Sequence, residues 1–388
     1  MTNETGRVFY GWYIVAVCWV VNFFVFGISV NTFTVYVKPI QADLGWSRGE
    51  ISLAISLSAV AMGLGAPFIG RLIDRIGARL AMAAGAAVIG VCMILLSQSQ
   101  SLPYFYAMFI VSGIGQGAAT IIPVSMVISN WFTAMRGKAL GIAMTGTGLG
   151  AMVMVPVSTW IVTNWGWRTS WQIMGCIILL MVPLNLLLIR TRPSDKGLLP
   201  DGGLVAPEVP ASARGLTVPE ALRTQGFWMI GAMMVLAGLV AMGVGVHLMP
   251  YLTDIGHTES RAGLIIAIIS GMTFLGKITL GSIVDRWGVQ PTVALAFGLI
   301  LTGILLLMGS GGLAVAFVFA IVYGLGLGAP LVVNPALTAE RLGLKHVGGV
   351  FGVLTVLNTG GVALGAVLTG FIYVAAGSYM PALLRFVA

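Results

Sequence analysis

The chain has 388 residues, of which 58% are hydrophobic and only 8% are charged, and its mean hydropathy is +1.00. A soluble domain carries about 25% charged residues, so this composition excludes a soluble globular protein and indicates one that crosses a membrane several times. The net charge of +8 would also fit a nucleic-acid-binding protein, but the positive charges are concentrated on alternate loops, which excludes one.

Apolar segments follow one another along most of the chain. Residues 1–7 are short and polar, and the apolar run after them is longer than the roughly 7–15 residues of a signal-peptide core, so it is predicted to be the first spanning helix. A spanning helix needs about 20 apolar residues. We expect such helices at 11–36, 51–72, 78–97, 103–129, 138–163, 169–190, 224–249, 262–284, 291–309, 313–337 and 348–375, with a twelfth that starts near Tyr379.

The connection between the sixth and seventh helices is the one long polar segment. It holds prolines at 193, 200, 207, 210 and 219 and the pair Gly202-Gly203, which is typical of a linker. We therefore predict an N-terminal six-helix bundle at 1–190, a cytoplasmic linker at 191–223 and a C-terminal bundle at 224–388. The last helix is expected to be incomplete, with its remainder not included in this sequence, because half a helix would leave backbone groups unsatisfied in lipid.

Positive charge is concentrated on alternate connections. Most of the 20 lysines and arginines lie at the N-terminus or in loops that would share its side of the membrane, whereas the opposite loops hold Lys38, Arg48, Arg168 and Arg261. This is the positive-inside pattern, so we expect a multi-pass protein of the inner (cytoplasmic) membrane with its N-terminus in the cytoplasm. Topology explains the basic excess, and no nucleic-acid partner is expected.

One charged turn occurs twice in the chain. Residues 70–79, with the sequence GRLIDRIGAR, are followed 211 positions later by residues 281–288, with the sequence GSIVDRWG. The same offset relates Pro39, Asp43, Gly45, Gly113, Gly115, Gly117 and Gly141 to Pro250, Asp254, Gly256, Gly324, Gly326, Gly328 and Gly352. A register kept over so much of each half indicates a duplicated unit, which is a common build of membrane transporters.

The first copy resembles the loop signature between helices 2 and 3 of the major facilitator superfamily, and the second is similar to its weaker copy between helices 8 and 9. The resemblance covers nearly the whole sequence. It implies an all-α membrane protein with the twelve-helix major facilitator fold, made of two pseudo-symmetric six-helix bundles. In relatives this loop latches the cytoplasmic side, which implies gating by Asp74, Arg75, Arg79, Asp285 and Arg286. Simple anchoring of the loops in the cytoplasm is the alternative.

Lys277 is a cation predicted to lie at membrane depth. It precedes Asp285 by eight residues, which is about 12 Å at a helical rise of ~1.5 Å per residue and too deep for easy snorkelling. Ser270, Thr273 and Lys277 share one helix face through their i, i+3, i+7 spacing. An ammonium on a polar helix face predicts a seat for an anionic substrate; a structural lysine bonded to neighbouring carbonyls is the alternative.

Polar stripes on other predicted helices lie at compatible depth, and for each of them substrate contact and interhelical hydrogen bonding are both open. Asn22 and Asn31 fall on opposite faces of the first helix, so only one of them can face a cavity. The further substrate-binding candidates are Asn31, Gln116, Thr273, Tyr323, Thr355, Asn358 and Thr359. His247, near the outer end of the seventh helix, is a candidate for proton coupling because histidine changes charge near neutral pH.

Two stretches are similar to the monocarboxylate transporters of that superfamily, and most similar to their prokaryotic members. They are Tyr10-Gly11-Trp12-Tyr13, which enters the first helix, and residues 131–146 with Trp131-Phe132 and Arg136-Gly137-Lys138, which enter the fifth. This sequence departs from the family pattern at three positions. Family members usually have an arginine where Lys277 stands, an aspartate implicated in proton coupling where Thr273 stands and, in animals, a lysine where Asn31 stands.

The sequence thus predicts a secondary active transporter that moves a small monocarboxylate of the lactate or pyruvate type by alternating access, with a proton. One buried cation neutralises one carboxylate, which favours a monoanion. The alternatives are an organic-anion exchanger of the oxalate/formate type, a carrier of a larger organic acid and, from another class, a non-transporting membrane sensor. We expect a monomeric functional unit, no cofactor and no enzymatic activity, since the sequence shows no nucleophile–base pair, no metal-ligand spacing and no nucleotide motif. The glycine arrays at 113–117, 146–150 and 324–328 lie inside apolar spans and are predicted to let helices pack closely.

Overall fold

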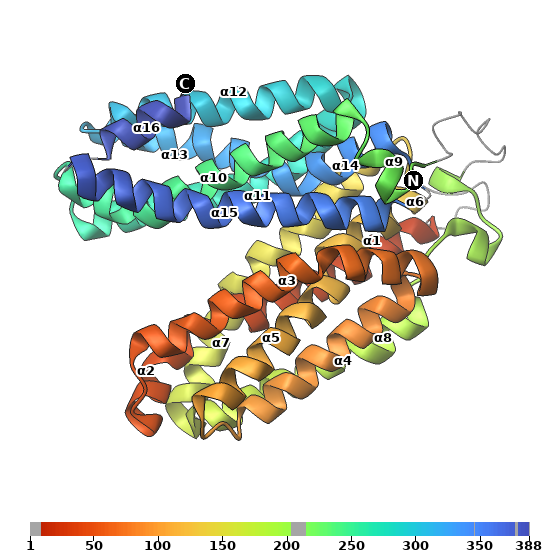
Figure 1. Ribbon diagram of the computed structural model, residues 1–388, viewed down its shortest axis with the longest axis horizontal. Helices are drawn as coiled ribbons and strands as arrows, with labels where there is room; N and C mark the ends of the chain where they lie inside the picture. The colour runs from red at the N-terminus through yellow and green to blue at the C-terminus, as the bar shows by residue number, and fades with distance from the viewer. Residues whose placement is uncertain (1–8, 203–214, 345, 377–378, 388) are drawn as a thin grey trace. The chain divides into compact units, whose positions relative to one another are not determined.

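The structure, a computed structural model, describes residues 9–202, 215–344, 346–376 and 379–387, and these residues form helices and short connections without any strand (Figure 1). The first half contains α1 (Tyr10–Phe26), a π-helical turn (Gly27–Asn31), α2 (Phe33–Leu44), α3 (Arg48–Ile76), α4 (Ala78–Leu96), α5 (Leu102–Ala119), α6 (Ile121–Trp131), α7 (Arg136–Leu179) and α8 (Met181–Leu188). The linker holds two 3-10 turns (Pro193–Lys196 and Pro200–Gly202) and α9 (Val218–Ala221). The second half contains α10 (Gln225–Asp254), α11 (Glu259–Trp287), α12 (Val289–Met308), α13 (Leu313–Leu327), α14 (Pro330–Leu342), α15 (Val347–Ala376) and α16 (Met380–Val387).

Ten helical stretches of the described chain are long and apolar enough to cross a membrane. One of them, Arg136–Leu188, has 53 residues and contains Gly166 with φ 81, a left-handed conformation that breaks the helix. Since one crossing takes about 20 residues, this stretch accounts for the predicted fifth and sixth spans together. The prediction of an all-α membrane protein is confirmed.

The described chain divides into two compact units. Unit 1 consists of Met1–Ala134, Ile142–Ala221 and Ala339–Val353, and unit 2 consists of Met135–Gly141, Leu222–Thr338 and Leu354–Ala388. The first turns of α7 and α15 therefore belong to a different unit from the rest of each helix. The predicted linker at 191–223 includes residues 203–214, which lie outside the described residues, and its role as a boundary stays a prediction.

Four of the predicted spans are interrupted in the structure, among them the sixth, where α7 ends at Leu179 and α8 begins at Met181. The π-helical turn Gly27–Asn31 interrupts the first span, and Thr120, with φ −120 and ψ −114, separates α5 from α6. In the second half, α13 ends at Leu327 and α14 begins at Pro330. The sequence could not reveal these breaks, because apolar periodicity continues across them.

Close helix packing in each unit depends on glycines of the predicted arrays. In unit 1, a Cβ on Gly113 of α5 would lie 2.2 Å from the Ser58 carbonyl oxygen of α3. In unit 2, a Cβ on the repeat-related Gly324 of α13 would lie 2.7 Å from the Ile269 carbonyl oxygen of α11. Both separations are shorter than a real Cβ contact, so the prediction that these glycines allow close packing is confirmed for two of the three arrays, 113–117 and 324–328.

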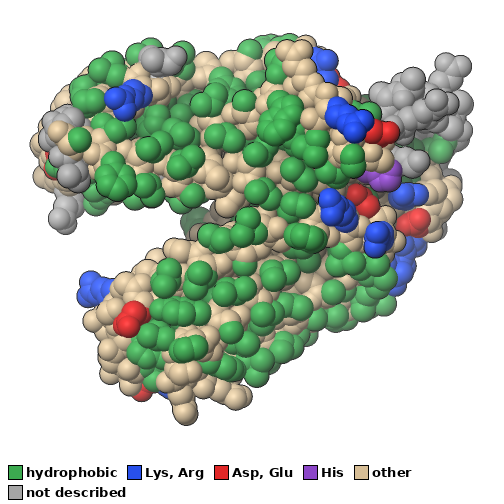
Figure 2. Space-filling view, viewed as in Figure 1, with side chains coloured by type: hydrophobic (Ala, Val, Ile, Leu, Met, Phe, Trp, Pro, Cys, Tyr) green, Lys and Arg blue, Asp and Glu red, His purple; other side chains and the backbone are tan. Residues whose placement is uncertain are grey.

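Large hydrophobic side chains cover the outer faces of the helices, as the space-filling view shows for one side (Figure 2). Residues exposed by half or more include Phe68, Met152, Leu180, Leu187, Trp228, Met229, Leu236 and Phe371. Such a surface would aggregate in water but fits the hydrocarbon of a bilayer. The predicted membrane environment and the packing of the helices therefore agree.

Candidate functional site

Lys277 lies in the middle of α11 and is 5% exposed. The backbone around it is tightly enclosed inside unit 2: a Cβ on Gly141 would lie 2.2 Å from the Lys277 carbonyl oxygen, and one on Gly328 would lie 2.5 Å from the Lys277 nitrogen. The lysine is thus held on three helical segments that bring their backbones together through glycine. The predicted burial of this cation is present in the structure.

Thr273 and Ser270 lie on the same helix one and two turns before Lys277. The Thr273 hydroxyl donates to the Ile269 carbonyl at 2.8 Å, and the Ser270 hydroxyl donates to the Ile266 carbonyl at 3.0 Å. Hydroxyls whose protons are used in this way can still accept hydrogen bonds but cannot donate to a carboxylate. On this face the ammonium of Lys277 is therefore the group suited to an anion.

The polar stripe on α15 is bonded in part within unit 2. The Asn358 amide donates to the Met234 carbonyl of α10 at 2.8 Å, and the Thr359 hydroxyl donates to the Thr355 carbonyl of its own helix at 2.9 Å. All three side chains remain partly exposed. The structure thus gives Asn358 a role in joining helices and leaves its amide oxygen for another partner.

In unit 1 the predicted polar candidates are bonded to backbone or to neighbouring side chains. Gln116 is buried and its amide lies 3.4 Å from the Ser58 hydroxyl. Asn31 ends the π-helical turn and donates to the Phe26 carbonyl at 2.8 Å, while the fully buried Asn22 donates to the Ala143 carbonyl at 3.1 Å. A π-helical turn shifts the angular register of the helix after it, so rotation angles derived from the sequence alone do not hold beyond the turn.

Tyr323 lies inside the apolar core of unit 2. It is 1% exposed, its ring stacks on Phe319 at 5.4 Å between centroids, and it packs against Gly303 of α12. Within the described part of the chain its hydroxyl has no hydrogen-bond partner. A buried hydroxyl of this kind costs free energy, which makes Tyr323 the most unusual member of the candidate set.

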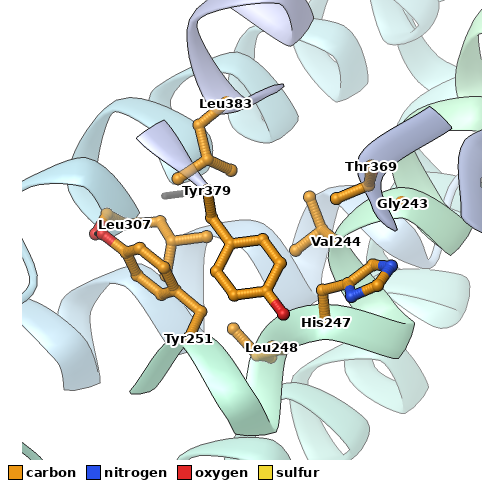
Figure 3. Close-up of a pocket in the computed structure, with 9 residues that line it drawn as sticks. All are labelled: Gly243, Val244, His247, Leu248, Tyr251, Leu307, Thr369, Tyr379 and Leu383. Atoms are coloured by element: carbon orange, nitrogen blue, oxygen red, sulfur yellow. The ribbon is translucent and has the colours of Figure 1, made fainter. Parts of the chain in front are cut away.

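His247 lines a pocket with an empty volume of about 230 Å³ in unit 2 (Figure 3). Its ring lies 5.3 Å from that of Tyr379, whose hydroxyl points toward α10 on the side of His247 and Leu248. The other polar groups in the lining are the hydroxyl of Tyr251, which donates to Leu307 at 3.0 Å, and that of Thr369, which donates to Gly365 at 2.8 Å. The pocket thus combines an imidazole with hydroxyls in an otherwise apolar wall.

The repeat-related positions in unit 1 carry different side chains. Subtracting the offset of 211 residues from His247 and Thr369 gives Tyr36 and Ser158. Ser158 donates to the Tyr36 hydroxyl at 2.9 Å, and Ser170 lies 3.0 Å from the same oxygen. All three side chains are buried, and the Tyr36 ring packs on Trp171 at 4.9 Å. Sequence reasoning missed this cluster, although the offset would have pointed to it.

The two aspartates of the repeated turn each bind the first turn of another helix. In unit 1, Asp74 of α3 accepts a hydrogen bond from the Gly349 amide of α15 at 3.0 Å. In unit 2, Asp285 of α11 accepts from the amides of Gly137 and Lys138 in α7, at 2.6 and 2.8 Å. The first amides of a helix lack intrahelical partners and carry partial positive charge, so a carboxylate there is a strong cap.

Glycine lets these caps form. A Cβ on Gly70 would lie 2.0 Å from the Gly348 carbonyl oxygen, and a Cβ on Gly137 would lie 2.2 Å from the Gly281 carbonyl oxygen. The arginines that accompany the aspartates differ: Arg75 and Arg286 are exposed, whereas Arg79 is partly buried, with an Nε that has no hydrogen-bond partner among the described residues. The repeated motif thus supplies the same cap in both units.

A second charged group was not singled out by sequence reasoning. Asp43 at the end of α2 forms an ion pair with Arg168 of α7 and accepts a hydrogen bond from the Trp167 indole at 3.2 Å. The Arg168 guanidinium lies over the Trp167 ring at 4.1 Å. The repeat of Asp43 as Asp254 was the available signal, but Arg168 has Tyr379 as its repeat-related residue, so the ion pair is not repeated.

Comparison with known proteins places these features in one family. The profile of the Major Facilitator Superfamily matches residues 19–366. The chain is 24% identical to monocarboxylate transporter 13 of Bos taurus, over 95% of this chain and 84% of that protein, and 24% identical to monocarboxylate transporter 2 of Homo sapiens, over 95% and 81%. It is also 22% identical to the MFS-type transporter YhjX of Escherichia coli (strain K12), over 84% and 80%.

Solved structures show the same fold. The E. coli fucose:proton symporter FucP superposes with a TM-score of 0.73 at 15% identity, covering 97% of this chain and 96% of that one. The proton:xylose symporter XylE gives a TM-score of 0.73 at 14% identity, covering 97% and 92%. The chain belongs to the Major Facilitator Superfamily. The predicted family and major facilitator fold are confirmed, and the protein is a membrane transporter rather than an enzyme.

Proposed function

We propose that this transporter moves a small monocarboxylate of the lactate or pyruvate type across the inner membrane by alternating access, together with a proton. The observation that carries the proposal is Lys277, a buried cation in the middle of a spanning helix of unit 2. Relatives named monocarboxylate transporters, which align along 95% of the chain, support the substrate class. We further propose a monomeric functional unit with a cytoplasmic N-terminus, as the positive-inside pattern favours.

Lys277 is proposed to bind the substrate carboxylate. A charge in a low-dielectric span is expensive, so residues of this kind usually serve a substrate or ion pathway. A lysine ammonium carries three N–H donors and a positive charge, whereas the hydroxyls of Thr273 and Thr359 each donate their one proton to a backbone carbonyl. Because lysine is a point charge rather than a fork, it suits a single carboxylate without bidentate geometry. The remaining proposed contacts are Asn31, Gln116, Thr273, Tyr323, Thr355, Asn358 and Thr359.

The two helix caps are proposed to act as gates, with Arg75, Arg79 and Arg286 completing the charged turns. Asp74 and Asp285 each hold the first turn of a helix that continues into the other unit, so forming or releasing the caps would be linked to rearrangement during transport. Charge-assisted bonds to helix-terminal amides are strong enough to bias an equilibrium yet can exchange with water. The two repeats would then contribute equivalent elements.

His247 is proposed to take part in proton coupling. Histidine changes charge between pH 5 and 8, and a proton-binding residue in a spanning region needs polar groups beside it. The titratable groups around it are Tyr251 on α10, Tyr379 beside α16 and Tyr373 on α15, whose ring stacks on that of Tyr379. Asp254 on α10 interacts electrostatically with Tyr379, and α12 contributes the apolar Leu307.

The test is uptake of labelled pyruvate or lactate into proteoliposomes, with and without an imposed pH gradient. Accumulation that follows the gradient and is saturable is the expected result. Uptake only against preloaded anion would replace proton symport by exchange, as in the organic-anion alternative. Absence of uptake in both modes would reject a small monocarboxylate and turn attention to larger organic acids.

A further inference from the structure

Residues 189–202, which lead from the end of α8 into the linker, are bonded to the end of α6 in unit 1. The Trp131 indole donates to the Arg190 carbonyl at 2.8 Å, and the Asn130 amide donates to the Thr191 carbonyl at 3.1 Å, both from the end of α6. Thr191 also lies against Gly77, the turn that ends the first copy of the motif, where an added Cβ would be 2.9 Å from its hydroxyl. This segment therefore packs on the turns that carry the caps.

Asp201 makes the most specific of these contacts. One of its carboxylate oxygens accepts hydrogen bonds from the Thr133 and Ala134 amides, at 2.8 Å each, in the turn between α6 and α7. Its backbone has φ 56, a left-handed conformation that is uncommon for residues other than glycine. A strained backbone is kept where surrounding contacts hold it, and a carboxylate with two amide donors is such a contact.

The turn that Asp201 holds leads directly to the Asp285 cap. Thr133 and Ala134 end a segment of unit 1, and Met135–Gly141 belongs to unit 2. The next bonded amides along the chain are those of Gly137 and Lys138, which donate to Asp285. Only two residues separate the amides held by the linker from those held by the motif, so the peptide backbone transmits any displacement between them.

We propose that Asp201 is a positioning residue for transport: it fixes the turn before α7 and so sets how readily the Asp285 cap forms. The inference rests on the proposed gating role of that cap. At the equivalent turn before α15, the linker's contact is a backbone bond, from the Leu216 amide to the Leu342 carbonyl at 2.9 Å. The linker thus acts on the Asp285 cap through a side chain, which can be changed independently of the fold.

The experiment uses a cysteine reporter that needs no substrate. Val284 is 7% exposed and lies against Gly137, so Val284→Cys in a background lacking Cys18, Cys92 and Cys176 should react slowly with a maleimide while the cap is formed. Asp201→Asn is expected to raise the labelling rate about 5- to 10-fold, the scale of one lost charge-assisted hydrogen bond. Asp195→Asn is the matched control, because that carboxylate bonds the Arg192 amide of its own turn; it should leave the rate unchanged.

A double-mutant comparison separates positioning from a general loss of stability. If Asp201 acts through Asp285, Asp201→Asn should change the labelling rate less than about 2-fold in an Asp285→Asn background, because coupled residues are not additive. Equal effects in both backgrounds, or no effect in the first, would overturn the proposal. Ala134→Pro removes one of the two amide donors without altering Asp201, and it tests the proposal in place of Asp201→Asn if that variant does not fold. Cysteine labelling does not depend on uptake. A failure of the monocarboxylate proposal would therefore show in the uptake experiment and not in the labelling rates.

Discussion

The two units share a framework but differ in the chemistry placed on it. The backbone positions of Ala66 in unit 1 and Lys277 in unit 2 are equivalent: an added Cβ on Gly352 would meet the Ala66 carbonyl at 2.4 Å, and one on the repeat-related Gly141 would meet the Lys277 carbonyl at 2.2 Å. Yet one site carries a methyl group and the other an ammonium. The two repeats therefore share the close helix packing at this position but differ in the side chain that it holds.

The same divergence holds at a second pair of repeat-related positions. Unit 1 has Tyr36 bonded to two serine hydroxyls and an ion pair between Asp43 and Arg168. Unit 2 has His247 and Tyr379 at the positions of Tyr36 and Arg168, and both Tyr36 and His247 line a pocket of their own unit. A tyrosine with satisfied hydrogen bonds holds one state, whereas a histidine can gain a proton. We expect unit 2 to carry the cation that binds the carboxylate and the proton site, with unit 1 contributing only the polar contacts of Asn31 and Gln116.

The largest effect should result from removing the buried cation. Lys277→Gln is expected to reduce saturable uptake of labelled pyruvate roughly 30-fold or more, because losing one partner of a buried charge interaction costs about 2–5 kcal/mol. Lys38→Gln, which changes an exposed lysine, is the matched control and should transport normally. Unchanged uptake kinetics in a folded Lys277→Gln protein would show that unit 2 does not owe its function to this cation.

The two caps allow a direct comparison between the repeats. Asp285→Asn and Asp74→Asn are each expected to raise cysteine labelling, of Val284→Cys in unit 2 and of Val347→Cys in unit 1, by about tenfold, equivalent to ~1.4 kcal/mol at a helix terminus. Val347 is 6% exposed at the start of α15. Asp254→Asn, at an exposed position, should have no effect on either reporter. Equal labelling in wild type and cap variants would make the motif an anchor rather than a gate.

A smaller effect is expected from the histidine. His247→Gln should lower gradient-driven accumulation of pyruvate several-fold while leaving exchange of labelled for unlabelled pyruvate nearly intact, because exchange needs no net proton movement. His257→Gln is a suitable control, since that buried histidine bonds the Ser310 carbonyl at 2.8 Å in a connection outside the spans. Accumulation equal to that of wild type would remove His247 from the coupling.

The sequence predicted the framework well because its signals are local or repeated. Apolar length revealed the spans, and the offset of 211 residues revealed both Asp74 and Asp285. It could not predict which amides these carboxylates bind, since Gly349 and Lys138 lie far along the chain and meet them only through tertiary packing. The role of Asp201 could not be predicted for the same reason, because it depends on the amides of a distant turn that its carboxylate binds.

For the candidate site, the residue types and their positions along the helices were predictable from the sequence, but their contacts were not. Counting residues back from Asp285 predicted that Lys277 lies well inside a spanning helix, and in the structure Lys277 is buried within α11. In contrast, Asn358 and Thr273 already donate to backbone carbonyls, which no periodicity reveals. Whether a polar residue in a span joins helices or meets a substrate depends on the helix beside it.

The smallest expected effects come from two buried tyrosines, one in each unit. Tyr36→Phe removes a hydroxyl that has hydrogen-bond partners, so it should destabilise the protein by about 1 kcal/mol and lower the apparent Tm by a few degrees. Tyr323→Phe removes a hydroxyl without a partner among the described residues, so stability should be unchanged or rise by up to about 1 kcal/mol. Thermal unfolding in detergent, followed by intrinsic fluorescence, measures both. If Tyr323→Phe also raises the KM for pyruvate, its hydroxyl is used by the substrate; if Tyr323→Phe lowers the Tm as Tyr36→Phe does, the hydroxyl has a partner in the membrane and the contrast between the two units fails at this position.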